Sequence, residues 1–596
     1  MKRYVLGLLW LMSSWATAQT SPVSLTLPFF DDFSTSNTAS DAKNWVPGSG
    51  VYVNNTMGIS QPSVNMATFD GLRANGFPYT FTSQFANGYT DTLTSQPITL
   101  AGLAPADSVY LSFYWQRARF GELPDLGDSL KLEFLNRLGG WEQVWFQVGG
   151  QPDANAQRAF VTVRDSRFMH PAFQFRFRSY GRQSGAFDTW NLDYLYMNRG
   201  RTVFDRFIRD IAARLPITPF LKRYTAMPLK QYLANPAAET ADTISTDINN
   251  LNNNFNFTTF RFTTQELITR QVVQDLPVTA STLIAALSNQ RKLVRPTPLS
   301  ASFSGTRAVL KHTFSVLTTD NQNPSIPTID LRRNDTISSQ TVLDDYFAYD
   351  DGSAEYALQI GQRERVAVRF VLNKADVLTG VRACLMPFKA DQTGQAFTVS
   401  VYGSNRGRPG QLVFTQSFPI QYPATRNGFV TFTFNRAVAV TDTFFVGYQQ
   451  ISADDIAVIR LGFDRNSPFG REIFYNAGSG NWEQNLASAA LAQPGAFLLR
   501  PVIGGPTVNT LVTGVEQPEP LHELQVHPNP TTGIVGWDNA ALNQIEIMDM
   551  SGRLVQEIRP APGQQTADLS ALSGGFYLLR LSDGQRTTVQ RLVITR

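Results

Sequence analysis

The sequence predicts an all-β protein, namely a multidomain array of β-sandwich or jelly-roll and immunoglobulin-like domains with one short connecting helix. The chain has 596 residues, too many for one hydrophobic core, so roughly three to five domains are expected. Aromatic residues make up 12% and charged residues only 17% of the chain, a composition of folded β-rich domains rather than of disorder. Short segments with alternating apolar residues recur, as in strands with one buried face.

The N-terminus has the features of an export signal. Lys2 and Arg3 precede an apolar run at residues 4–12, and an A-x-A site follows, so cleavage is predicted between Ala18 and Gln19. The run is too short to span ~30 Å of hydrocarbon. No cysteine follows the cleavage site for lipid attachment, and no later stretch approaches a membrane-spanning length. We therefore expect an exported chain with no transmembrane anchor in the mature protein.

Residues 19–202 are expected to form the first β-sandwich. Apolar residues alternate at 108–115, 130–134 and 172–178, which predicts strands with one buried face. Two Gly-Gly pairs bracket residues 141–148, which predicts a further strand between two turns.

The order of features in this segment resembles MAM and concanavalin-like jelly-roll domains. The opening acidic-aromatic strand is Phe30-Asp31-Asp32-Phe33, a Ser-x-Pro-Ile element lies at 95–98, and the closing strand at 190–195 contains Asp193. The resemblance implies a jelly roll that binds a sugar or a protein. The paired cysteines of animal MAM domains are missing, because the chain has a single cysteine.

Asp31, Asp32 and Asp193 are the candidate metal ligands. They would supply hard oxygen ligands for calcium where the first and last strands meet, and calcium is the one cofactor that the residues suggest. The alternative is a set of solvated turn aspartates, since no EF-hand spacing is present. No catalytic residue and no cofactor-binding residue is predicted.

Residues 203–345 are expected to form a short helix followed by an immunoglobulin-like β domain. Four apolar residues have the i, i+3, i+4, i+7 spacing of a helical stripe, and Pro216 ends the pattern. The stripe consists of Phe204, Phe207, Ile208 and Ile211. Short alternating runs such as 255–262 and 310–316 then alternate with Asn, Thr and Pro turns.

A second jelly-roll-like β-sandwich is expected at residues 346–507. It opens with YFAYDDGSAE at 346–355, which resembles a string in large exported proteins of Bacteroidetes-type bacteria. Cys384 is interpreted as a buried small hydrophobe. Residues 508–522 are interpreted as a linker that proline keeps extended.

Residues 523–596 form a compact tail of short strands and turns. The strings PNPTTG, DMSGRLV, DLSALSGGFYLLRL and QRLVITR resemble the type A C-terminal sorting domain of the type IX secretion system. The motif residues are Pro528, Asn529, Pro530, Gly533, Gly552, Gly575 and Tyr577. The resemblance implies that the outer-membrane translocon recognises this domain and that the cargo reaches the cell surface or the medium. An ordinary terminal immunoglobulin-like domain is the alternative.

No sequence motif identifies a catalysed reaction. His170 and His312 lie in separate predicted domains, and His522 and His527 lie in or beside the tail. No HExxH, G-x-S-x-G, Walker A or dinucleotide fingerprint is present. The net charge of +3 comes without a basic cluster of the kind that binds nucleic acid. We expect binding or adhesion to a glycan, matrix or surface protein rather than catalysis. The alternatives are a secreted carboxylate-dependent hydrolase acting on polysaccharide, and a passive surface-layer or gliding-associated component.

Overall fold

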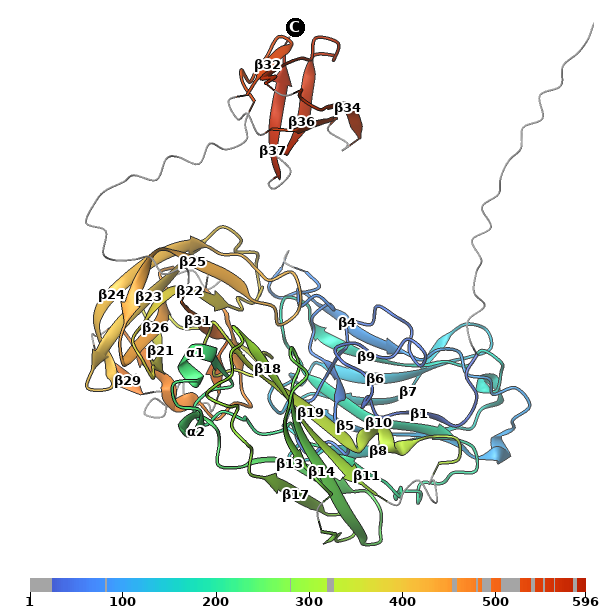
Figure 1. Ribbon diagram of the computed structural model, residues 1–596. Helices are drawn as coiled ribbons and strands as arrows, with labels where there is room; N and C mark the ends of the chain where they lie inside the picture. The colour runs from blue at the N-terminus through green and yellow to red at the C-terminus, as the bar shows by residue number, and fades with distance from the viewer. Residues whose placement is uncertain are drawn as a thin grey trace, which may run out of the picture. The chain divides into compact units, whose positions relative to one another are not determined.

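The computed structural model describes most of the chain, and its regular structure is almost entirely β (Figure 1). The described residues are 24–80, 83–278, 280–318, 326–452, 458–478, 481–484, 495–504, 526–537, 542–549, 553–561, 563–582 and 587–595. The prediction of an all-β fold is confirmed. The chain divides into two compact units, residues 1–506 and 507–596. The predicted signal peptide with Ala18 and Gln19, the predicted linker and Gly552 lie outside the described residues.

The first strands of the first unit form two sheets, which we call the N-terminal sandwich. One sheet has the order β2-β3-β10-β5-β8 with β1 paired to β10, and the other has the order β4-β9-β6-β7. The strands are β1 (Phe29–Asp31), β2 (Tyr52–Asn54), β3 (Met66–Phe69), β4 (Asn87–Thr94), β5 (Val109–Arg117), β6 (Ser129–Leu135), β7 (Trp141–Val148), β8 (Gln157–Val163), β9 (Phe175–Arg182) and β10 (Trp190–Asn198). One core holds both sheets together, with Trp45, Phe113 and Phe134 fully buried in it.

The next group of strands forms the middle sheets. Their orders are β11-β13-β17 and β12-β19-β18-β14-β15, with β16 paired to β14. The elements are β11 (Ile211–Ala213), β12 (Ala226–Pro228), α1 (Leu229–Tyr232), α2 (Pro236–Glu239), β13 (Ile244–Asn250), β14 (Asn256–Glu266), β15 (Val272–Leu276), β16 (Thr282–Ile284), β17 (Asn289–Val294), β18 (Ala308–Leu317) and β19 (Thr336–Asp344).

The helix predicted from the apolar stripe at 204–211 is wrong in its position. Residues 204–210 have no helix, Ile211 begins strand β11, and the short α-helices of the described chain are α1 and α2. Ile208 packs with Tyr194, while Ile211 packs with a different set of side chains. Phe204 is 80% exposed. The apolar residues therefore serve separate contacts of an extended segment, so their helical spacing does not reflect one buried face.

The last strands of the first unit form what we call the second sandwich. Its sheets have the orders β24-β23-β26-β21-β28-β29, β25-β22-β31 and β20-β27-β30. The strands are β20 (Tyr356–Leu358), β21 (Arg365–Val371), β22 (Asp376–Ala383), β23 (Ala396–Asn405), β24 (Arg408–Pro419), β25 (Val430–Val440), β26 (Thr443–Gln449), β27 (Leu461–Asp464), β28 (Ile473–Asn476), β29 (Glu483–Gln484), β30 (Ala496–Phe497) and β31 (Leu499–Ile503).

A single core joins the middle sheets to the second sandwich. Tyr224 is fully buried between the rings of Phe347 and Tyr349, at centroid distances of 4.8 and 4.9 Å. Its hydroxyl donates to the carbonyl oxygen of Val371 at 2.9 Å. The same core continues through both sets of sheets, so these two parts of the chain pack as one body.

The second unit is the tail, with sheets β34-β33-β36-β37 and β32-β35. Its strands are β32 (Ile534–Gly536), β33 (Gln544–Met548), β34 (Leu554–Ile558), β35 (Thr566–Asp568), β36 (Gly575–Ser582) and β37 (Thr587–Ile594). The PNPTTG turn lies along the last strand, because the backbone N–H of Val593 donates to Asn529 Oδ1 at 2.9 Å and that of Thr531 donates to the carbonyl oxygen of Val593 at 2.9 Å. Gly533 has a φ of 148°, and a Cβ there would lie 3.0 Å from Ser570 Cβ.

We expect the shortening of one buried side chain to destabilise the tail. Leu579 is fully buried in the tail core, so Leu579→Ala should lower the free energy of opening of the tail by about 2–5 kcal/mol. The exposed Leu554 provides the control, and Leu554→Ala should change it by less than about 0.5 kcal/mol. Amide hydrogen exchange of peptides from 526–595 in the full chain measures both. Equal exchange in the two variants would contradict this core.

Candidate functional site: a basic cleft beside an acidic junction

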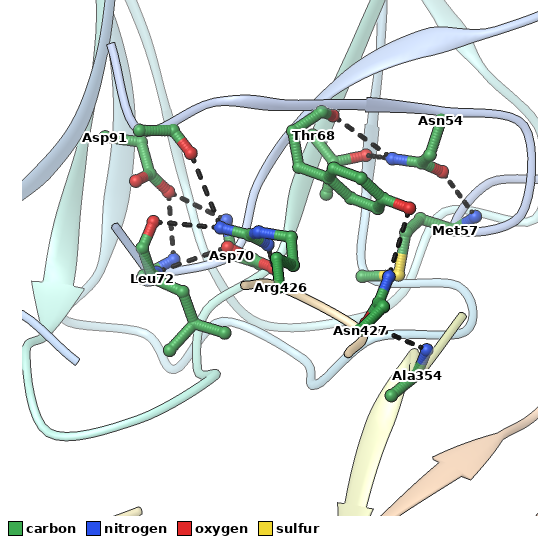
Figure 2. A network of polar contacts seen from close by, with 12 residues as sticks. Asn54, Met57, Thr68, Asp70, Leu72, Asp91, Ala354, Arg426 and Asn427 are labelled. Carbon is green, nitrogen blue, oxygen red and sulfur yellow. Dashed lines mark hydrogen bonds and ion pairs between the residues drawn. The ribbon is translucent and has the colours of Figure 1, made fainter. Parts of the chain in front are cut away.

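The guanidinium of Arg426 joins the two sandwiches (Figure 2). Arg426 lies between β24 and β25 of the second sandwich and forms an ion pair with Asp70, which follows β3 of the N-terminal sandwich. Arg426 Nη2 also donates to the carbonyl oxygens of Leu72 and Arg73 at 3.1 and 3.0 Å. The exposed fractions of the Arg426 and Asp70 side chains are 9% and 7%, so this contact is shielded from water.

Two further interactions complete the junction. The ring of Tyr52 lies under the Arg426 guanidinium at 4.9 Å, and Asn427 Nδ2 donates to the Tyr52 hydroxyl at 3.1 Å. Asp91 Oδ2 accepts from the backbone N–H of Asp70 at 2.8 Å, which holds the Asp70 loop in place. Burial and the charge of Asp70 raise the pKa of Asp91 to about 7. Burial alone would lower the pKa of Arg426, but the charges of Asp70 and Asp91 raise it.

An acidic cluster lies on the second-sandwich side of the junction. The carboxylates of Asp351, Glu355 and Asp464 have oxygens within 4.8 Å of one another, and they form the group of three possible metal ligands in the described part of the chain. The backbone N–H of Asp351 donates to Asp464 Oδ2 at 2.8 Å. The Ser353 hydroxyl donates to Glu355 Oε1 at 2.7 Å. Asp351 and Glu355 belong to the DDGSAE string that the sequence singled out.

Crowding of these carboxylates changes their ionisation. Burial, followed by the charge of Asp351, raises the pKa of Glu355 to about 8. Burial and the charges of Asp351 and Glu355 raise the pKa of Asp464 well above its usual value. Hard oxygen ligands at this spacing could hold a divalent cation such as calcium. Without a cation, the cluster retains protons at neutral pH, because Glu355 and Asp464 are buried beside each other and close carboxylates in such a site do not all ionise.

Asp31, Asp32 and Asp193 lie where strands β1 and β10 pair, as the sequence predicts. All three are buried, and each already accepts hydrogen bonds from protein donors. Asp31 Oδ2 accepts from Trp45 Nε1 at 2.6 Å, and Asp32 Oδ2 accepts from Asn334 Nδ2 at 2.8 Å. Burial, followed by the charge of Asp32, raises the pKa of Asp193 well above its usual value. Calcium binding by these residues remains a prediction.

A cleft of about 650 Å³ lies between the two sandwiches, and we call it the basic cleft. Its charged lining residues are Arg119, Glu122, Arg182, Lys389, Arg460 and Arg465. Its aromatic lining residues are Phe187, Tyr356, Phe388 and Phe463. The described lining of the cleft therefore combines five cationic side chains with a single carboxylate and several aromatic rings.

Further contacts between the sandwiches lie along this cleft. The rings of Phe187 and Phe388 approach to 4.6 Å between centroids. Gly185 has no side chain to separate the sandwiches, since a Cβ there would lie 2.5 Å from the Phe388 ring. The backbone N–H of Lys389 donates to the carbonyl oxygen of Ser184 at 2.6 Å. These contacts set the relative position of the lining residues.

Adjacent residues at the ends of two strands belong to different regions, the acidic cluster and the basic cleft. Glu355 and Asp464 are buried in the cluster, whereas their neighbours Tyr356 and Arg465 line the cleft. Glu355 directly precedes β20 and Arg465 directly follows β27, so the same two segments supply carboxylates to one region and a ring and a cation to the other. The backbone N–H of Arg465 donates to Glu355 Oε2 at 2.9 Å and joins the two regions.

Two other residues that the sequence analysis discussed have structural roles. His312 is buried and lies within hydrogen-bond distance of the Thr264 and Thr341 hydroxyls at 3.0 and 3.1 Å. Burial lowers the pKa of His312 to about 4. Cys384 is 3% exposed, and burial raises the pKa of its thiol to about 12. The interpretation of Cys384 as a buried small hydrophobe is confirmed.

The tail identifies the secretion route of the protein. Residues 525–595 match the family model of the secretion system C-terminal sorting domain. The chain is therefore a cargo protein of the type IX secretion system, and its C-terminal domain is the part that interacts with the secretion machinery. This domain implies export across the outer membrane to the cell surface or extracellular space. Within the described residues, no helix has the length and apolar character needed to cross a membrane.

Similarity to other known proteins is weak outside the tail. No curated protein matches the chain. A β-glucuronidase from Bacteroides uniformis aligns with 9% identity and a TM-score of 0.23 over 47% of this chain and 29% of that enzyme. The carbohydrate-binding module CBM28, specific for non-crystalline cellulose, aligns with 12% identity and a TM-score of 0.18 over 26% of this chain and 86% of the module. The chain thus spans less than a third of that enzyme, and these similarities carry no functional argument.

We expect replacement of Arg426 to loosen the junction. Arg426→Met leaves the buried Asp70 carboxylate without its cation, so the free energy of unfolding of the first unit should fall by about 3–5 kcal/mol. Urea unfolding of the full chain measures the loss. The double variant Arg426→Met with Asp70→Asn should recover part of it, because the unpaired charge is removed. The exposed Arg199 serves as the control, and an equal loss for Arg199→Met would contradict this role.

The raised pKa of Glu355 predicts that the stability of the protein falls as pH rises. Its pKa in the folded chain is about 8, above the ordinary 4.5, so between these values the folded state holds a proton that the unfolded chain has released. The proton on Glu355 therefore stabilises the folded state. This stabilisation is complete below about pH 4.5 and falls as pH rises to about 8, by at most about 1.4 kcal/mol per pH unit.

The variant Glu355→Gln should lose this dependence. We compare the free energies of unfolding of the variant and the native chain. The difference should shift in favour of the variant between about pH 5 and about pH 9, since the amide has no proton to release. Urea unfolding at both pH values measures the difference. Glu483→Gln, at an exposed position, is the control. A parallel pH profile for Glu355→Gln and the native chain would show that Glu355 is not held protonated.

Proposed function

We propose that the protein is an exported polysaccharide-binding protein whose ligand site is the basic cleft, and that it acts by binding rather than by catalysis. The observation that carries this proposal is the cleft between the sandwiches, about 650 Å³ in volume and lined by aromatic rings and hydrogen-bond donors. Ligand sites in proteins have volumes of this order and combine apolar walls with a few polar groups. Export to the cell surface or beyond places such a site where extracellular polysaccharides occur.

The aromatic side chains favour a sugar ligand. Tyr356 is 37% exposed and lines the cleft together with Phe187 and Phe388. A sugar ring has an apolar C–H face that packs on an aromatic ring, while its hydroxyls reach neighbouring donors and acceptors. The guanidinium and amide groups around the rings supply such partners, Gln359 among them.

The arrangement of the carboxylates supports binding over hydrolysis. Glycosidases of the common type need two carboxylates that flank the substrate, about 5–10 Å apart. In the described part of the chain, one carboxylate lines the basic cleft, that of Glu122. Glu355 and Asp464 are close enough to each other, but they are buried and do not line this cleft.

A secreted polysaccharide hydrolase is the second candidate function, and one observation favours it. Glu355 has a pKa raised to about 8 and lies within 4.8 Å of two other carboxylates, as a general acid beside a carboxylate would. Asp351 lines a separate cavity of about 560 Å³ with Asp350. Release of reducing sugars by the native chain, lost in Glu355→Gln, would establish hydrolysis in place of binding alone.

We expect Tyr356 to contribute to ligand binding. Tyr356→Ala removes an exposed ring of the cleft and should weaken polysaccharide binding by roughly tenfold, with unchanged thermal unfolding. A glycan array identifies the ligand, and isothermal titration calorimetry of the full mature chain measures the change. Phe257→Ala, at a ring 53% exposed on the middle sheets, is the matched control. No glycan binding by the native chain, or an equal loss in both variants, would contradict the proposal.

A further inference from the structure

We infer that the basic cleft selects anionic polysaccharides, whose carboxylate or sulfate groups its cationic side chains recognise; this inference rests on the proposed function. Among the described residues that line it, the cleft has five cations, Arg119, Arg182, Lys389, Arg460 and Arg465, and one carboxylate, that of Glu122. The whole chain has a net charge of only +3 from 51 basic and 48 acidic residues. The charge of the cleft is therefore a local excess rather than a reflection of the average surface.

Three of the cations, Arg182, Arg460 and Arg465, are held in place by contacts within the protein. The guanidinium of Arg182 lies over the Phe187 ring at 4.7 Å, and that of Arg460 lies over the Phe388 ring at 4.6 Å. Arg465 lies over the Tyr356 ring at 5.5 Å, and its Nη1 donates to the carbonyl oxygen of Phe120 at 2.9 Å. An anion that enters the cleft meets side chains already ordered, so less conformational entropy is lost on binding.

The assembly of like charges has an electrostatic cost that an anion would relieve. Burial lowers the pKa of Arg465, and the positive charge of Arg119 lowers it further. Arg119 and Arg465 come from different sandwiches, so the junction brings these cations together. A carboxylate or sulfate between them replaces repulsion with attraction. Since Arg460 is only 3% exposed, part of this charge lies where water screens it weakly.

The residue types indicate which anions fit. Four of the five cations are arginines, whose planar guanidinium donates paired hydrogen bonds to a carboxylate or a sulfate. The aromatic rings beside them pack against the apolar faces of the sugar rings. A duplex nucleic acid needs an extended basic face that follows its phosphates, whereas this cavity of about 650 Å³ encloses a short segment of a single chain.

Two matched pairs of polymers test the inference with the full mature chain. Dextran and dextran sulfate share a backbone and differ in sulfate, while methyl-esterified and de-esterified polygalacturonate differ in carboxylate. We expect at least one charged member to bind at least tenfold more tightly than its neutral counterpart. This preference should shrink as salt rises from about 0.01 M to about 0.15 M, which shortens the Debye length from about 30 to about 8 Å.

Variants assign the preference to the cleft. Arg119→Gln with Arg182→Gln removes two of the five cations and should lower the affinity for the charged polymer at least tenfold, with little effect on any neutral one. Arg199→Gln is the control, because this exposed arginine is not among the lining residues. Circular dichroism and thermal unfolding verify that the variants remain folded.

The outcomes separate this inference from the proposed function. Binding of neutral and charged polymers with equal affinity, or an equal loss in the control, overturns the charge preference and leaves polysaccharide binding intact. Binding of duplex DNA as tightly as the charged polymers overturns the assignment to polysaccharides. If no polysaccharide of either kind binds, the array included, the proposed function itself fails.

Discussion

The ion pair between Arg426 and Asp70 is the interaction on which the arrangement of the first unit depends. It is buried, it joins the two sandwiches, and backbone carbonyls and the Tyr52 ring complete the coordination of the guanidinium (Figure 2). Removing one member of a buried charge pair is costly, because it leaves the other charge without its partner. The ion pair therefore stabilises this mutual placement of the sandwiches, in which the cleft lies between them.

Charge is separated across this junction. The carboxylates of Asp351, Glu355 and Asp464 are gathered on one side, and burial keeps protons on Glu355 and Asp464. The arginines on the cleft side keep their charge, since a guanidinium loses its proton only at high pH. The unit thus holds neutral acids and charged bases close together, with the backbone N–H of Arg465 donating to Glu355 Oε2.

Local patterns predicted the strands, but the site arises from long-range packing. The strand at 141–148 has the predicted bounds because glycine pairs fix both ends, and the tail was predicted because its turns and strands follow a family order. The helix predicted from the apolar stripe at 204–211 is wrong, because the same spacing of apolar residues also suits an extended segment between two cores. The cleft could not be predicted, because its cations lie at positions from 119 to 465 and alternation does not say which sheets meet.

The distance along the chain between Asp70 and Arg426, 356 residues, has a consequence for the order of events during synthesis. Contacts of such high contact order form slowly, after most of the chain is available. The sorting domain occupies residues 525–595, so it is translated after every residue of the junction. A chain truncated anywhere before the tail lacks the sorting domain for export across the outer membrane, and a chain that has this domain already contains both halves of the cleft.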